Sequence, residues 1–211
     1  MRVYLRALEP EDYKTSIKWR KDESIWAMLG GHKYFVSEAY EKKWVEDTIT
    51  SGKDIKLAVC LVDGDRYIGN VYMTDIDMIN RSCHSHIIIG EKDCWGKGYA
   101  CEALQLAIEF MVNERGIQRI EALILEENKQ SLRMHEKCGY VLEGIKRNAV
   151  YRFNNTLLCE KVCIKVFNFQ NVSGIAHSGE IFRLVAFAMF ISLKLLHHLI
   201  IFLSNLTDLA T

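Results

Sequence analysis

The sequence predicts an α/β (α+β) domain in which a mixed β-sheet carries helices on both faces. Strand-like and helical segments alternate along residues 1–170. The segment Tyr99–Glu114 repeats apolar side chains at i, i+3 and i+4 spacing, which is typical of a helix with one buried face. The apolar run Ile87–Ile89 precedes a glycine-containing turn, which indicates a buried strand leading into that helix.

The predicted helices have residues at their ends that suit helix capping. Ser37 is of the type that caps helix N-termini, and Gly116 and Gly139 lie where a C-cap glycine belongs. The four predicted helices are Glu9–Arg20, Ser37–Thr50, Tyr99–Glu114 and Ser131–Cys138.

The predicted strands are short runs rich in β-branched and aromatic residues. The segment DGDR at 63–66 separates two of them and indicates a hairpin. The seven predicted strands are Val3–Arg6, Leu57–Asp63, Tyr67–Thr74, Ser82–Gly90, Ile120–Leu125, Tyr140–Glu143 and Leu157–Phe167.

The composition excludes several classes of protein. The chain has 211 residues, enough for one domain with a sizeable core. Lys+Arg and Asp+Glu both number 27, which argues against a strongly basic nucleic-acid binder and against an acidic disordered chain. The N-terminus MRVYLRALEPED has no apolar region of the kind found in secretory signals, so we expect a cytoplasmic protein.

The cysteines argue against structural disulfides and metal binding. They number seven, an odd count, and they contain no close CxxC pairs. This pattern fits neither a disulfide framework nor a zinc ribbon. We expect ordinary buried thiols in a reducing compartment, and no metal ion.

The charge density falls sharply near residue 170. Only Glu180, Arg183, Lys194 and Asp208 are charged beyond it, so we predict a domain over 1–170 and a hydrophobic, helical extension over 171–211. The stretch 183–203 is long enough to span a bilayer core at about 1.5 Å per residue. Lys194 near its centre would cost about 3 kcal/mol. We expect packing on the domain or on a second subunit, with membrane contact or no selected role as the alternatives.

The most informative segment joins the run Ile87–Ile89 to the long helix through WGKGYAC at 95–101. The first amides of a helix lack partners within the helix, and the helix dipole favours negative charge there. Glycines at 96 and 98 allow close approach of a phosphate, and Lys97 adds a positive charge. The spacing fits neither standard nucleotide-binding motif, and a plain strand-to-helix turn is the alternative.

A second segment, NKQSLRMHEKCGY at 128–140, also follows a strand and begins a helix. Asn128 suits a polar loop or capping role. Ser131 and His135 are four residues apart and share one helical face.

Together the two segments resemble the GCN5-related N-acetyltransferase (GNAT) superfamily. The opening LRALEPEDY, the WRKD at 19–22, the INRS at 79–82 and the GIKR at 144–147 are similar to a branch holding spermidine, ribosomal-protein N-terminal and amino-sugar acetyltransferases. The resemblance covers about residues 3–167. It implies a mixed, mostly antiparallel sheet with a V-shaped opening between two parallel strands.

The resemblance implies acetyl-CoA as co-substrate. Its pantetheine arm would pair with the backbone of Ile87, Ile88 and Ile89, and Asn128 and Ser131 would lie near that arm. The pyrophosphate would rest on the backbone amides of the loop and first helical turn. Those residues are Trp95, Gly96, Lys97, Gly98, Tyr99, Ala100 and Cys101.

The resemblance also implies direct attack of a neutral amine on the thioester. The family's usual acid is a tyrosine seven residues after the asparagine, where this chain has His135. We predict that His135 donates the proton, with a simple contact role as the alternative. The family's glutamate base corresponds to His84, and His86 alternates with His84 on one face of the strand. We predict His84 as base and His86 as a substrate contact, with a solvated pair as the alternative.

The acceptor site is expected near the second predicted helix. We predict that the acidic residue Glu41 of this helix contacts the amine, with a solvated helix face as the alternative. We therefore predict an acetyltransferase acting on a primary amine of a polyamine or amino sugar, in a homo-oligomer. Acetylation of a protein α-amine and a non-catalytic acyl-CoA-binding module are the alternative functions.

Overall fold

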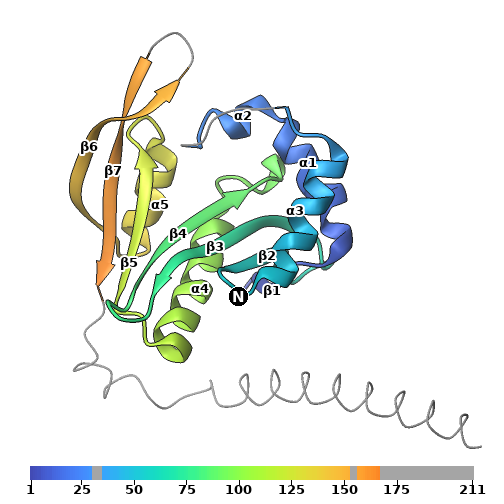
Figure 1. Cartoon of the computed structure of the whole chain (residues 1–211), viewed down its shortest axis with the longest axis horizontal. Helices are drawn as coiled ribbons and strands as arrows, with labels where there is room; N and C mark the ends of the chain where they lie inside the picture. Colours follow the sequence, from blue (N-terminus) through green and yellow to red (C-terminus); the bar gives the residue numbers. More distant parts are fainter. Residues whose placement is uncertain (30–34, 153–155, 167–211) are drawn as a thin grey trace, which may run out of the picture. The chain divides into compact units, whose positions relative to one another are not determined.

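The computed structural model describes residues 1–29, 35–152 and 156–166 (Figure 1). The predictions for the extension 171–211, including those for its apolar stretch 183–203, lie outside this part of the chain. In the part described, no helix is both long and apolar enough to cross a membrane.

The elements in chain order are β1 Val3–Ala7, η1 Pro10–Asp12, α1 Tyr13–Lys21, α2 Glu23–Trp26, α3 Glu38–Ser51, β2 Ile55–Leu61, β3 Tyr67–Asp77, β4 Ser82–Ile89, η2 Lys92–Cys94, α4 Tyr99–Arg115, β5 Arg119–Leu125, α5 Lys129–Lys137, β6 Val141–Arg152 and β7 Thr156–Val166.

The seven strands form one mixed sheet in the order β1-β2-β3-β4-β5-β7-β6. The β4–β5 pair is parallel, and the other neighbouring pairs are antiparallel. The predicted fold class is therefore confirmed. The order β5-β7-β6 inserts the last strand between two earlier ones, which places β5 in the interior of the sheet.

Two elements differ from the sequence prediction. The helix α2 has four residues, too few to produce a periodic apolar pattern. The strand β6 extends to Arg152, well beyond the predicted end at Glu143. Its register with β7 shifts twice, and Asn148 has a positive φ of 54°. These irregularities break the two-residue alternation by which a strand is recognised.

The sheet buries a different set of side chains on each face, because neighbouring residues of a strand point in opposite directions. Val59 and Val71 belong to a core that α4 covers with Leu104 and Met111. Ala58, next to Val59 in β2, belongs to a second core. Figure 1 shows α4 on one side of the sheet and α1 and α3 on the other.

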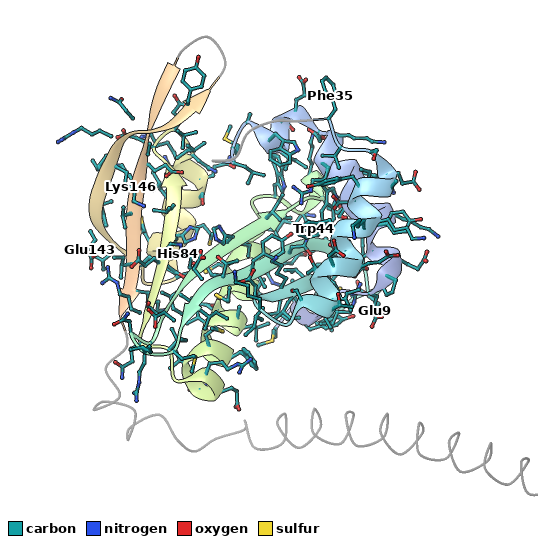
Figure 2. All side chains as sticks on the ribbon, in the orientation of Figure 1. Glu9, Phe35, Trp44, His84, Glu143 and Lys146 are labelled. Carbon is teal, nitrogen blue, oxygen red and sulfur yellow. The ribbon has the colours of Figure 1, made fainter. Side chains whose placement is uncertain are left out.

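The second core is built around aromatic rings. Trp19 of α1 is buried, and its ring centroid lies 4.8 Å from that of Tyr67 on β3. Its Nε1 donates a hydrogen bond to Glu91, 2.9 Å away. Trp44 of α3 packs at the margin of this core, between the helix and the sheet (Figure 2). The aromatic side chains thus fix α1 and α3 against the sheet near the end of β4.

Gly90 gives the Trp19 ring its space. A Cβ at Gly90 would lie 2.0 Å from Cδ2 of Trp19, which is far inside contact distance. The backbone N–H of Gly90 also donates to the carbonyl of Ile68 at 2.9 Å, so the backbone has a fixed position. The packing of α1 on the sheet therefore depends on glycine at this position.

We expect Gly90→Ala to lower the free energy of unfolding by about 2 kcal/mol, because the methyl group overpacks the core. Gly144→Ala is the matched control, since a Cβ at Gly144 meets no atom within 4 Å. It should change stability by less than about 0.5 kcal/mol. Urea unfolding followed by tryptophan fluorescence measures both variants, and equal stabilities would contradict the prediction.

Candidate active site

The two parallel strands part soon after they meet. The β4–β5 register covers three pairs, from Ser82 with Arg119 to His84 with Glu121. Beyond His84, β4 continues to Ile89 beside β3, and β5 continues to Leu125 beside β7. Figure 1 shows the two strands diverging. The edge of β4 that faces β5 has no strand partner over 87–89 among the described residues, so its backbone is available to an extended ligand.

The glycine loop leads from the open end of β4 to α4. Gly96 and Gly98 have φ values of 72° and 87°, in the left-handed region that glycine adopts without strain. Gly98 is the N-cap of α4, and no side chain in the described part of the chain caps this end of the helix. The amides of the first turn, Tyr99–Cys101, therefore face outward without a capping partner and form a site suited to phosphate.

Side chains around the loop support this role. Lys97 is exposed beside the helix start. Nε1 of Trp95 donates to the carbonyl of Ile89 at 2.7 Å, which folds the loop back onto the end of β4. That bond occupies one of the backbone groups predicted to pair with pantetheine. Among the described residues, no side chain bonds to the backbone of Ile87 or Ile88, which pair with β3.

Asn128 has a structural role in the second predicted segment. Its Oδ1 accepts from the Ser131 amide at 3.0 Å and caps α5. Its Nδ2 donates to the carbonyl of Met28, also at 3.0 Å, and so connects α5 to the segment after α2. A contact of Asn128 or Ser131 with acetyl-CoA stays a prediction.

His135 lies inside the protein. It is 3% exposed, and its ring meets the Tyr140 ring edge-on with centroids 5.0 Å apart. Nδ1 lies 2.9 Å from the carbonyl oxygen of Ser131. Because a carbonyl only accepts, Nδ1 carries the proton and Nε2 of the neutral ring has none to donate. Burial lowers the pKa of His135, partly offset by the bond to Ser131, so the neutral form prevails at pH 7. This geometry argues against the predicted acid role.

A cavity of about 390 Å³ lies beside the open part of β4. The residues lining it come from α1, α2 and the segment after it, α3, β3, β4, β5 and β7. They are Ser16, Trp19, Arg20, Ile25, Trp26, Leu29, Glu41, Asn70, Tyr72, His86, Ile87, Ile88, Leu123 and Glu160. The cavity combines an apolar wall with a few polar groups, which is the usual character of a small-molecule site.

Glu41 lines this cavity, but it is 1% exposed and already has partners. Its Oε1 accepts from Ser16 Oγ at 2.6 Å, and its Oε2 accepts from Arg20 Nε at 3.1 Å. The Arg20 guanidinium also lies 5.5 Å from the Trp26 ring centroid and 5.1 Å from that of Trp44. Glu41 was predicted to contact the amine, but its negative charge is already balanced by Arg20.

The two strand histidines have different surroundings. His84 is the last residue paired with β5 and does not line the cavity. Its ring nitrogens lie 3.5 Å from Asp75 and 3.6 Å from Glu121. His86 lines the cavity two residues further along β4. Figure 2 shows His84 where β4 and β5 separate.

His86 is held in a tautomer that leaves one nitrogen free to accept a proton. The Thr74 hydroxyl donates to Asp75 Oδ2 at 3.3 Å, so it accepts from His86 Nε2 at 3.0 Å. Nδ1 then has a lone pair. Desolvation lowers the pKa of His86, and nearby His84 lowers it further. The ring is therefore neutral at pH 7 although it meets solvent through the cavity.

Tyr72 and Glu160 are among the cavity residues that the sequence prediction missed. Tyr72 on β3 lies opposite His86 in the β3–β4 register, and burial raises its pKa, so its hydroxyl stays protonated. Glu160 on β7 has no hydrogen-bond or ion-pair partner within the described part of the chain. Only the pairing of β7 between β5 and β6 brings Glu160 to the cavity, and no local sequence signal reports that pairing.

The described residues contain no group of three or more His, Cys, Asp or Glu side chains placed to hold a metal ion.

Comparison with known proteins identifies the family and the fold. The family model of the acetyltransferase (GNAT) domain matches residues 2–141 of this chain. A probable N-acetyltransferase of Bacillus subtilis is 27% identical over 157 residues, which cover 70% of this chain and 85% of that protein. A spermidine N(1)-acetyltransferase of Escherichia coli is 26% identical over 147 residues, covering 67% and 74%.

Solved structures show the same architecture. A spermidine N-acetyltransferase from Vibrio cholerae, crystallised with CoA and spermine, superposes with a TM-score of 0.71. The two chains are 22% identical, and the match covers 78% of this chain and 95% of the other. A GNAT-family acetyltransferase from Bacillus anthracis superposes with a TM-score of 0.69 at 20% identity, covering 79% and 95%.

We expect Gly98→Val to weaken coenzyme A binding at least about tenfold, or about 1.4 kcal/mol. A β-branched residue is strained at φ 87° and obstructs the uncapped amides. Gly116→Val is the matched control, because Gly116 ends the same helix with φ 65°. Calorimetric titration with coenzyme A on both folded variants measures the effect. Equal affinities would refute the assignment of the loop.

We expect His135→Phe to keep kcat at pH 7.5 within about threefold of the parent, whereas loss of a working acid typically costs about a hundredfold or more. The reason is that the neutral ring donates from Nδ1 to Ser131. Steady-state release of coenzyme A measures kcat. A fall beyond tenfold with unchanged coenzyme A affinity would restore His135 as the acid.

Proposed function

The chain belongs to the acetyltransferase (GNAT) family, and from this premise we propose that it moves the acetyl group of acetyl-CoA to a primary amine of a small molecule by direct attack. The observation that carries the proposal is the position of the cavity. His86, Ile87 and Ile88 line it, and all three lie beyond the last residue of β4 that pairs with β5. An extended thioester along β4 and an amine in the cavity would therefore meet.

The chemistry that we assign to this chain is mainly positioning and proton removal. His86 is placed to take a proton from the ammonium of the acceptor through Nδ1, directly or through one water, so that a neutral amine attacks the thioester. Backbone amides along β4 would polarise the thioester carbonyl. A thiol has a pKa of about 8.5, so its thiolate can leave without being protonated by a side chain of the protein. His86 takes the base role predicted for His84 because His86 lines the cavity.

Glu160 is the acceptor contact that we propose in place of Glu41. The ion pair with Arg20 balances the charge of Glu41, whereas Glu160 reaches the cavity without a partner among the described side chains. A cationic amine would find its counter-charge there. Relatives named spermidine N(1)-acetyltransferases support a small amine as acceptor, and polyamines and amino sugars remain the predicted classes.

A panel of amines tests the function. Purified protein is mixed with acetyl-CoA and one amine at a time, and coenzyme A release and product mass are recorded. A polyamine, an amino sugar, an arylalkylamine and a peptide with a free α-amine cover the acceptor classes. Release that depends on a small amine supports the proposal. Binding of acetyl-CoA without transfer to any amine indicates a binding module, and transfer to the peptide alone indicates α-amine acetylation.

We also expect a homo-oligomer. One relative from Vibrio cholerae, a spermidine N-acetyltransferase, has a dodecameric structure. Light scattering of this chain measures its own state.

We expect His86→Gln to lower kcat/KM for the amine by about a hundredfold, because a positioned base contributes about that much or more. His84→Gln is the matched control on the same strand and should stay within about threefold. The parent's kcat/KM should fall as the pH drops through the pKa of His86, below its usual 6.5, because protonation removes the base. A larger loss in His84→Gln than in His86→Gln would return the base role to His84.

We expect Glu160→Gln to raise KM for the amine about tenfold while coenzyme A affinity stays constant, because the counter-charge of the ammonium is lost. Glu143→Gln on the neighbouring strand is the control, since Glu143 is paired with Arg119 outside the cavity. Equal KM values in both variants would exclude Glu160 from the acceptor site.

A further inference from the structure

Two cysteine side chains from different helices meet behind the start of α4. Cys101 lies in the first turn of α4, and Cys138 is the C-cap of α5. Their Sγ atoms are 2.7 Å apart. Non-bonded carbon atoms pack at about 3.5–4.0 Å, and sulfur is larger than carbon. The distance between these two sulfur atoms is therefore shorter than an ordinary packing distance. They are nevertheless free thiols in the structure.

Separate elements hold the two cysteines in position. Cys101 follows the glycine loop in a long helix, where its backbone conformation is fixed. At Cys138, the backbone N–H donates to the carbonyl of Met134 at 3.1 Å, and Lys165 of β7 donates to the Cys138 carbonyl. A disulfide needs an S–S distance of about 2.05 Å, so the sulfur atoms have only a short way to move.

The two thiols differ in access to reagents. Cys138 is 2% exposed, and burial, together with the neighbouring Cys101, raises the pKa of its thiol. Cys101 is partly exposed. A small reagent in solution therefore reaches Cys101 first, and Cys138 lies directly behind it as a second thiol.

We propose that Cys101 and Cys138 form a site of reversible oxidation to a disulfide. The oxidant that we name is a low-molecular-weight disulfide. Cys101 attacks one of its sulfur atoms and releases the first small thiol. Cys138 then attacks Cys101 Sγ and releases the second small thiol, so the protein loses two electrons and two protons while the oxidant is reduced to two thiols. In a reducing compartment such a bond is transient.

The disulfide would join two helices that border the candidate active site. It closes a loop between cysteines 37 residues apart and ties the first turn of α4, where the phosphate-binding amides lie, to the end of α5. Closing a loop of this length restricts the unfolded chain. We expect the midpoint of thermal unfolding to rise by about 10 °C on oxidation. This oxidation is independent of the acceptor and of catalysis.

The test uses the full chain, reduced and then incubated with oxidised glutathione. Peptide mapping without reductant should give one linked peptide pair, Cys101 with Cys138, and the intact mass should fall by two hydrogens. Dithiothreitol should reverse both changes. Cys94→Ser is the matched control, because Cys94 is a buried thiol of the same loop without a sulfur neighbour among the described residues. It should form the disulfide as the parent does.

Single variants show the order of the steps. Cys138→Ser should stop at a glutathione adduct on Cys101, and Cys101→Ser should give neither adduct nor disulfide at Cys138. A lasting adduct on Cys101 in the parent, or linkage of either cysteine to another partner, would overturn the proposal. If Cys138→Ser does not fold, the linked pair and the reversible rise in melting midpoint of the parent, compared with Cys94→Ser, still decide it.

Discussion

The parting of β4 and β5 after three residue pairs is the constraint on which the site depends. Had the parallel pairing continued, β5 would have covered the backbone of 87–89, and no edge would remain for an extended ligand. The divergence is stable because each strand keeps another partner, β3 for β4 and β7 for β5. Placing β7 between β5 and β6 thus supports the opening and also brings Glu160 to the cavity.

The sequence predicted those parts of the site that rest on local interactions. The glycine loop and the start of α4 could be found because glycine at a positive φ and an apolar helical period are properties of neighbouring residues. The choice between His84 and His86 could not be made in this way. Both point to the same face of β4, and only the place where β5 departs, set by long-range pairing, separates one from the other.

Glu41 shows why a residue type alone does not define a binding group. The sequence places an acidic side chain on the predicted acceptor helix, and the structure does direct it into the cavity. However, a buried carboxylate requires compensation. Ser16 and Arg20 of α1 provide it, and the guanidinium of Arg20 also lies near the aromatic rings of Trp26 and Trp44. The pair therefore holds α1 to α3 and forms part of the cavity wall, and the charge of Glu41 is balanced within the protein.

The first turn of α4 is fixed from several directions, and this explains how its uncapped end keeps a defined geometry. The backbone amide and guanidinium of Arg2 both bind Glu102, which joins the turn to the start of β1. Cys101 contacts Cys138 and so joins the same turn to α5. Amides that lack capping partners would otherwise be solvated and free to fray. Since neighbouring side chains already hold the turn, an anion binding to it needs little ordering of the backbone, which is the condition for tight binding by a few amides.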